Sequence, residues 1–411
     1  MLKTLKKNTV FTFATSYFAF SFALGPFMMS VGLIIFVFVS LFHIQKFTIE
    51  KREILFLAGY CMLFLLYTIG IFKTPFIDRG INLVVRTLPI ILVPIFLILT
   101  KASIKLNYKI LKQFFIYGTL LSCIISLLSA GLQLAQGSSY SQILYFDFAR
   151  IVHLHPTYYS LYIVTALVFL FGVRPPLILW RLKFCIGIIF VLALILLQSK
   201  IALLLIITLG VFYFLRTLFI RNKGETIFLG ILLVVLLTGA FLMKGGRLNE
   251  LTKERDKAEI GTLDEDGLSQ RLWLWKTAKE HMQESQLLGF GLGSQEKLFR
   301  YKVAKTLLKT DLSPAVVKAT KSISTLNMHN NYIQVWYELG LIGLCSFVIG
   351  IIVVIIEGVK RQNYQGILVY CVFLVMLGVE VMLNRQMGIY YYSFIPILLL
   401  LETSKNASNE M

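Results

Sequence analysis

The sequence predicts an all-α, polytopic membrane protein with about twelve transmembrane helices and one large helical loop outside the membrane. Apolar runs of roughly 20 residues, the length that crosses a bilayer, recur along most of the chain. Of the 411 residues, 57% are hydrophobic and only 15% are charged, and the mean hydropathy is +0.77. The short alternating segments of a membrane β-barrel are not visible in the sequence.

The expected membrane spans follow from the length of each apolar run and from the charges that flank it. Their approximate centres lie near Ala14, Ile35, Phe64, Ile91, Leu121, Ala166, Leu192, Leu209, Val234, Ser346, Val375 and Ile397. The N-terminal stretch has basic residues and then an apolar run, as a signal peptide does. Because many more spans follow, we expect it to remain as the first helix.

The orientation follows from the lysines and arginines, which gather in alternate connections, for example around Lys51, Lys105, Arg181, Arg221 and Lys360. Short loops rich in these residues stay in the cytoplasm. Both termini are then expected to be cytoplasmic. This bias also explains the net charge of +19, so we expect no nucleic-acid partner.

The predicted topology divides the chain into four parts. Residues 1–243 hold nine transmembrane helices, and residues 244–328 form a large polar loop on the non-cytoplasmic side. Residues 329–402 hold three more transmembrane helices, and residues 403–411 form a cytoplasmic tail. Connections as long as this loop are usually functional, so we expect the site to lie there.

Within the loop, the stretch "LSQRLWLWKTAKEHM" predicts an amphipathic helix. Its apolar stripe consists of Leu268, Leu272, Trp275, Ala278 and Met282. Arg271 lies beside this stripe. The following "GFGLGS", residues 289–294, predicts a hinge where the backbone turns tightly and approaches another surface. A nucleotide loop is not favoured, because no strand precedes the glycines and no Lys-Ser/Thr pair follows them.

The loop ends in "MHNNYIQVWYELGLIG", where a polar segment becomes a membrane helix. His329 is expected at the start of this helix, with Thr325 and Asn327 as candidate caps. Free N–H groups at a helix start favour an anion and a neutral imidazole that can act as a base. The competing interpretation is an interfacial histidine without chemistry. Glu338, an ionisable residue inside the apolar run, favours a functional site.

Other polar residues are expected on the same side of the membrane. Lys200, Arg385 and Gln386 lie at the predicted ends of spans, either at a substrate site or as interfacial anchors. Arg150 and His155 open another span on that side. His153 and His155 form a histidine pair in this stretch, but no third ligand accompanies them, so we expect neither a metal site nor a cofactor.

"RLWLWKTAKEH", "LLGFGLGS" and "HNNYIQVWYELGLIG" together resemble the O-antigen ligase and polymerase superfamily of membrane glycosyltransferases. In that family an arginine precedes a Trp-containing helix, a Gly-rich turn follows, and His-Asn begins a helix that ends in Glu-x-Gly-hydrophobic-Gly. "LGVEVMLNRQMGIYYYSF" resembles a further family segment. The family commonly has Ser-Arg where this chain has Ser199 and Lys200, so the role of Lys200 is less secure.

The resemblance implies a GT-C-like fold in the inner membrane of a Gram-negative bacterium, with the large loop in the periplasm. It implies an undecaprenyl-diphosphate-linked glycan as donor, lipid A–core as acceptor, membrane lipids as surroundings, and inversion without a metal. His329 matches the catalytic histidine and Arg271 the diphosphate-binding arginine. Lys200, Arg385, Gln386, Asn330, Arg150 and His155 are candidate substrate-binding residues.

Three alternatives to O-antigen ligase remain open from the sequence. An O-antigen polymerase shares the architecture but uses a second carrier-linked glycan as acceptor. A related enzyme attaches glycans to protein. A lipid or glycan transporter would carry out no chemistry, and it predicts paired charges at the membrane midplane.

Overall fold

The computed structural model describes residues 2–44, 49–101, 106–172, 179–220, 268–310 and 327–402, together with residues 230 and 234. The regular secondary structure in the described part of the chain is all helical, with no strand. The helices before the large loop are α1 (Leu2–Ser21), α2 (Pro26–Leu41), α3 (Lys51–Tyr60), α4 (Met62–Gly70), α5 (Ile77–Thr87), α6 (Pro89–Lys101), α7 (Tyr108–Ala135), α8 (Phe146–Arg150), α9 (Pro156–Gly172), α10 (Trp180–Leu197) and α11 (Lys200–Ile220). The later helices are α14 (Leu268–Met282), η7 (Gln295–Phe299), α15 (Arg300–Thr310), α17 (Asn331–Lys360), α18 (Tyr364–Leu377), η8 (Met382–Asn384) and α19 (Gln386–Leu401).

Eleven of the expected span centres lie on these helices, and the segment around Val234 lies outside the described residues. By length and composition, 3 helices within the described residues can cross a membrane alone: Ile77–Thr100, Tyr108–Ala135 and Asn331–Lys360. Lys51–Tyr60 and Met62–Lys73 form a pair bent by 60°, which would make a fourth span. The structure therefore supports a multi-pass membrane protein, and the count of twelve spans stays a prediction.

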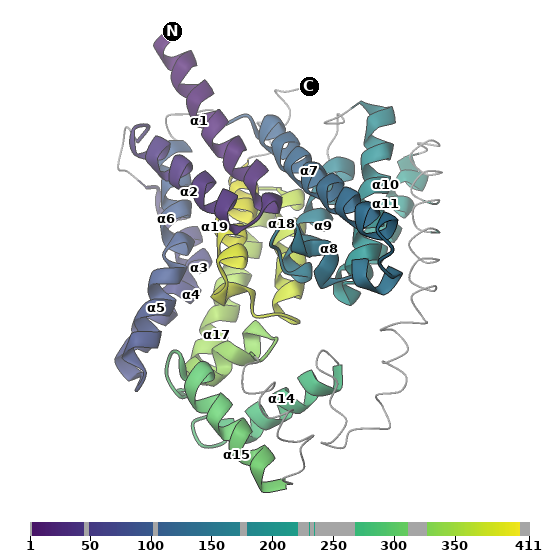
Figure 1. The fold of residues 1–411 in the computed structure, drawn as a ribbon. Coiled ribbons are helices and arrows are strands. Elements are labelled where there is room, and N and C mark those ends of the chain that lie inside the picture. Colours follow the sequence, from purple (N-terminus) through teal and green to yellow (C-terminus); the bar gives the residue numbers. More distant parts are fainter. Residues whose placement is uncertain are drawn as a thin grey trace.

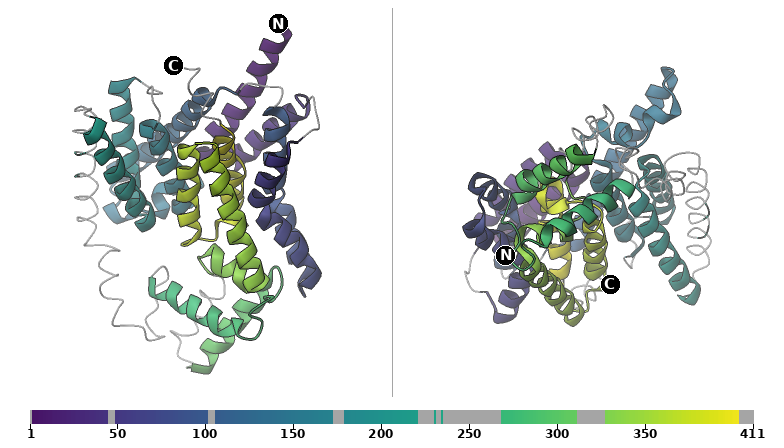
Figure 2. Two further views of the ribbon diagram at one scale, coloured as in Figure 1. Left: turned by 180° about the vertical axis from the view of Figure 1, so that it is seen from behind. Right: turned by 90° about the horizontal axis from the view of Figure 1, so that it is seen from below.

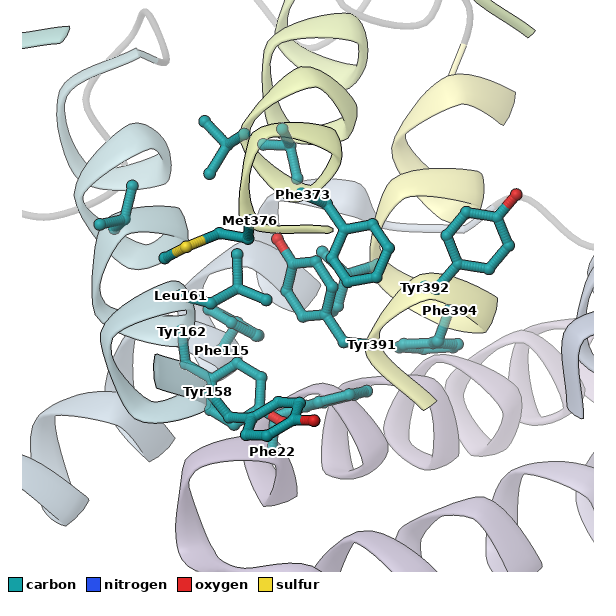
Figure 3. Packing of buried hydrophobic residues seen from close by; sticks show 14 of the residues in the cluster. Phe22, Phe115, Tyr158, Leu161, Tyr162, Phe373, Met376, Tyr391, Tyr392 and Phe394 are labelled. Atoms are coloured by element: carbon teal, nitrogen blue, oxygen red, sulfur yellow. The ribbon is translucent and has the colours of Figure 1, made fainter. Parts of the chain in front are cut away.

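The core lies where α19 passes through the middle of the bundle, between α6, α18 and α2. Aromatic side chains fill this region: Phe22, Tyr162 and Phe373 surround Tyr391 (Figure 3). The Tyr391 hydroxyl shares a hydrogen bond of 2.5 Å with the Thr165 hydroxyl. A buried phenol needs such a partner, because an unpaired hydroxyl away from water costs free energy.

The segment 268–310 lies at the end of the bundle away from the two termini (Figure 1). Seen from below, α14 and α15 lie across this end of the molecule (Figure 2). α17 connects the segment to the bundle, since its first turns contact α14 and η7 while its later turns pack against α3 and α4. α14 matches the helix expected from "LSQRLWLWKTAKEHM", but the predicted stripe is wrong at Leu272, which is 52% exposed, whereas Leu274 is buried. Leu268 is helical, but its side chain lies outside the described residues.

Candidate functional site

The polar residues before α17 form the start of that helix. Asn330 is the N-cap, and its side-chain oxygen accepts hydrogen bonds from the backbone N–H groups of Tyr332 and Ile333. The expectation that Asn327 caps the helix is wrong, and Thr325 lies outside the described residues. The Asn327 side chain instead accepts from the backbone N–H of His329 at 2.8 Å, because Asn stabilises tight turns two residues ahead of itself.

The two asparagines of "HNN" fasten the start of α17 to the link between α18 and α19. Asn330 Nδ2 donates to the carbonyl of Gly378 at 3.0 Å, and Asn331 Oδ1 accepts from the backbone N–H of Leu383 at 3.0 Å. The amide atoms that make these bonds are engaged within the protein. Asn330, a predicted substrate-binding residue, therefore has a structural role: it caps α17 and binds the link between α18 and α19.

His329 lies at the junction of these segments, with a φ of 46° that few residues other than glycine adopt. Its Nδ1 lies 3.0 Å from Oε2 of Glu380, and its side chain is 19% exposed. A strained backbone held by well-defined contacts is typical of functional positions. The structure therefore places His329 as a fixed, partly accessible imidazole.

Glu380, the partner of His329, is a buried carboxylate whose side chain is 7% exposed. Its Oε1 accepts from the backbone N–H of Val381 at 3.0 Å and from Nδ2 of Asn327 at 3.3 Å. Burial alone would raise the pKa of this carboxyl, but the hydrogen bond from His329 and the charge that His329 carries when protonated, with a contribution from His155, hold the pKa at about 2. Glu380 is therefore ionised throughout the physiological range.

The Gly-rich turn behaves as the sequence predicts, since it packs backbone against backbone with α17. Phe290 N–H donates to the carbonyl of Tyr337, and Gly291 N–H donates to the carbonyl of Glu338, both at 2.9 Å. α17 is interrupted at Gly340, whose φ is 71°. A Cβ on Gly340 would lie 2.2 Å from the carbonyl oxygen of Leu287, so only glycine allows this approach.

The carboxylate of Glu338 completes this contact. Its Oε1 accepts from the backbone N–H groups of Gly293 and Gln295 at 3.1 and 3.4 Å, and Oε2 accepts from Nε2 of Gln334 at 3.4 Å. The functional interpretation of Glu338 therefore gives way to a structural one: the acid binds the glycine turn.

A cavity of about 190 Å³ opens where these segments meet. It is lined by Arg86, Gln295, Glu296, Arg300, Asn327, Gln334, Val381, Asn384 and Arg385. The lining comes from α5, from η7 and the start of α15, from the start of α17, and from the link that precedes α19. Asn327 joins the cavity to His329 and Glu380, since it is hydrogen bonded to both.

The cavity is strongly positive. Arg86, Arg300 and Arg385 line it, whereas the one carboxylate among its lining residues, Glu296, also pairs with Arg79 at 3.4 Å. Burial lowers the pKa of Arg300; Glu296 opposes this change, and the positive charges of Arg79 and Arg385 add to it. Guanidinium groups gathered against their mutual repulsion favour an anion, above all a phosphate.

Two predicted site residues are brought to this place. Arg385 lines the cavity directly, and the charge of His155 acts on Glu380. Arg271 is half-buried and has no hydrogen-bond or ion-pair partner among the described residues. It lies one turn before Trp275, whose indole N–H donates to the carbonyl of Met328 at 2.7 Å. Arg271 is therefore on the α14 face that reaches the residue before His329.

Other predicted residues are placed elsewhere. Lys200 begins α11, which packs against α9 and α10 and contributes no lining residue to the cavity. Arg150 is exposed at the end of α8. Gln386 ties α19 to α2, since its Nε2 donates to the carbonyl of Pro26 and to the Ser30 hydroxyl at 3.0 and 2.7 Å.

The sequence pattern did not single out Glu380, Arg300 and Glu296 as members of the site. Glu380 had a usable signal, because an isolated acid in the apolar stretch "LGVEVMLN" costs free energy unless it has a partner. Arg300 and Glu296 gave no usable signal in the sequence, since charged residues in a polar loop usually lie on a solvated face. No group of three His, Cys, Asp or Glu residues that could hold a metal ion occurs within the described ranges.

The fold and the site define a multi-pass helical membrane protein with an arginine-lined cavity near a histidine. Residues 184–348 match the family model described as O-antigen ligase. This match supports membership of the O-antigen ligase and polymerase superfamily, whose members are membrane glycosyltransferase-like enzymes acting on lipid-linked glycans. A search of curated proteins finds no match.

Proposed function

We propose that this chain is an O-antigen ligase in a bacterial inner membrane. It transfers a glycan from undecaprenyl diphosphate to the lipid A–core oligosaccharide at the periplasmic face. The observation that carries the proposal is the cavity lined by Arg86, Arg300 and Arg385, which adjoins His329 through Asn327. A phosphate-binding group and a base side by side are what glycosyl transfer from a lipid diphosphate requires.

The arginines bind the donor diphosphate. As the bond between the anomeric carbon and the diphosphate oxygen breaks, negative charge grows on that oxygen. Fixed guanidinium groups stabilise this charge without rearrangement, and removing one such donor from an active site typically costs about 10²–10³-fold in rate. Arg271, on the face of α14 that carries Trp275, is assigned to the same diphosphate, and Lys200 to the approach of the carrier lipid.

His329 takes the proton from the acceptor hydroxyl. The oxygen then forms its bond to the anomeric carbon, while the diphosphate leaves with the electron pair on the opposite face, so the configuration inverts. Positioned bases of this kind contribute about 10²–10⁴-fold to rates. The step uses no metal and no nucleotide.

The sugars lie between these groups. Gln334 lines the cavity and is 1% exposed, and its Oε1 has no hydrogen-bond partner among the described residues. A buried amide oxygen without a partner is costly, and a sugar hydroxyl would satisfy it. We assign His155 and Arg150 to the acceptor side, and Asn330 and Gln386 to holding the start of α17 and of α19.

The experiment is lipopolysaccharide electrophoresis of a deletion strain, complemented with the wild type or with His329→Ala. We expect bare lipid A–core with polymer left on the carrier, full restoration by the wild type, and none by His329→Ala despite normal amounts in the membrane. Core that carries a single repeat would instead identify a polymerase. An unchanged banding pattern would refute glycan transfer and favour the transporter.

A further inference from the structure

The contact between His329 and Glu380 joins two segments that are far apart in sequence. Nδ1 of His329 lies 3.0 Å from Oε2 of Glu380. An ionised carboxylate can only accept hydrogen bonds, so Nδ1 must carry the proton that bridges these atoms. The neutral imidazole then has its lone pair on Nε2.

The carboxylate cannot turn away from the imidazole. Oε1 is held by the backbone N–H of Val381 and by Nδ2 of Asn327, at 3.0 and 3.3 Å, which leaves Oε2 for the histidine. Glu380 is also fixed through its backbone, because its N–H donates to the carbonyl of Met376 at 3.1 Å. Two donors on Oε1 and one backbone hydrogen bond thus set the direction of Oε2.

The groups around Glu380 explain why a carboxylate beside His329 is useful. The α17 end contributes His329, the segment before α9 contributes His155, and α9 contributes Tyr158, whose hydroxyl donates to the carbonyl of Val381 at 3.5 Å. Arg385 at the start of α19 acts on Tyr158. Positive groups that bind a diphosphate also weaken a nearby base, and a buried anion opposes this effect.

We infer that Glu380 is a positioning residue for His329, which accepts the Nδ1–H of the imidazole and so leaves Nε2 as the atom that takes the proton of the acceptor hydroxyl. This inference rests on the proposed function. During transfer the proton moves from the hydroxyl to Nε2 and the imidazole becomes a cation, which Glu380 stabilises as an ion pair. The proton later leaves Nε2 to water or to the released diphosphate.

The test uses Glu380→Gln, because the surroundings determine how the amide must lie. Val381 N–H and Asn327 Nδ2 are donors, so the amide oxygen takes the place of Oε1. The NH2 group then faces Nδ1 of His329 and donates to it, which moves the imidazole proton to Nε2. An imidazole with its proton on Nε2 cannot accept the proton of the acceptor hydroxyl there, so we expect transfer to fall by about 10³–10⁴-fold.

The matched control is Glu284→Gln. This change removes an exposed carboxylate that pairs with Lys302 at 2.5 Å within the 268–310 segment. We expect transfer within about twofold of the wild type, as for most exposed ion pairs. Glu380→Asp keeps the charge, so we expect its transfer to exceed that of Glu380→Gln by about tenfold or more. Equal losses for the Asp and Gln variants would overturn the inference.

A second readout does not depend on transfer. In protein labelled with ¹⁵N-histidine, the nitrogen signals of His329 are assigned by their loss in His329→Gln. We expect Nδ1–H in the wild type and Nε2–H in Glu380→Gln. Nε2–H in the wild type would overturn the inference even if the variant fails to fold. Wild-type transfer by His329→Ala would refute the base role of His329 and with it this inference. An unchanged lipopolysaccharide banding pattern in the deletion strain would refute the proposed function instead, while the nitrogen signals still report the contact.

Discussion

Charged side chains gather at both ends of the bundle, and the two gatherings differ in how their charges are paired. Near the chain termini lies a cluster of four cations and three carboxylates, which we call the balanced charge cluster because each of its carboxylates is paired: Arg52, Glu53, Lys112, Glu357, Lys360, Arg361 and Glu402. At the other end lies the arginine-lined cavity. In the balanced charge cluster every carboxylate has a cation within 3 Å, whereas in the cavity Glu296 is the one lining carboxylate beside three arginines.

The balanced charge cluster fastens helices that are distant in sequence. Arg361 pairs with Glu53 at 2.9 Å and lies over the ring of Phe56, and Lys112 pairs with Glu402 at 2.8 Å. These ion pairs engage each of the three carboxylates of the cluster within the protein. The cavity has the opposite property, because three of its lining residues are arginines and only Glu296 among them is a carboxylate. Pairing therefore distinguishes the charges that hold the fold from the charges that the proposed function assigns to the donor diphosphate.

The largest expected effect comes from removing charge from the cavity. Arg300→Ala combined with Arg385→Ala should lower transfer by at least about 10³-fold, since each guanidinium lost from an anion site typically costs 10²-fold or more. The thermal midpoint should stay equal or rise, because two like charges no longer repel each other. Transfer within tenfold of the wild type would show that the donor diphosphate does not bind in this cavity.

The converse change in the balanced charge cluster should act on stability alone. Glu53→Ala leaves Arg361 buried without its partner, and we expect the free energy of unfolding to fall by about 3–5 kcal/mol. Arg52→Ala is the control: Arg52 is 51% exposed, so its loss should cost less than about 1 kcal/mol. Denaturant unfolding in detergent measures both. A loss of transfer per folded molecule in Glu53→Ala would contradict the division of roles.

A smaller effect is expected where the glycine turn meets α17. Gly340→Ala places a Cβ against Leu287 at a backbone conformation that costs about 1–3 kcal/mol. The 268–310 segment should then loosen, become sensitive to protease, and lose about tenfold in transfer. Gly131→Ala is the matched control, because a methyl group added there would meet nothing within 4 Å. Identical protease patterns for the two variants would refute this role of Gly340.

The stability that Glu380 contributes should depend on pH. Its folded-state pKa of about 2 lies below the ordinary value of 4.5, so its contribution is complete above about pH 4.5 and is lost as the pH falls towards 2. The difference in thermal midpoint between the wild type and Glu380→Gln should therefore be constant from about pH 7 to 5 and shrink below. A difference that grows on acidification would contradict the assignment of charge to Glu380.

The smallest effect is expected from metal removal. Treatment with a chelator should leave transfer unchanged, because the cavity supplies its positive charge through arginines. Purified protein assayed with and without chelator, at equal ionic strength, provides the measurement. Inhibition that a divalent ion reverses would mean that the guanidinium groups do not suffice.

The sequence alone was enough for the helical fold class, for the amphipathic helix α14 and for the close approach of the glycine turn. These features follow from local patterns: apolar length, helical spacing, and the backbone freedom of glycine. It also singled out His329 and Arg385, because polar residues at the ends of apolar runs are rare and costly.

Only the tertiary structure decided what these residues do. It paired His329 with Glu380, gave Glu338 and Asn330 structural parts, and joined Arg300 to Arg385 across separate segments. No spacing in the chain encodes such contacts, because the energy of a buried charge depends on partners brought by distant helices.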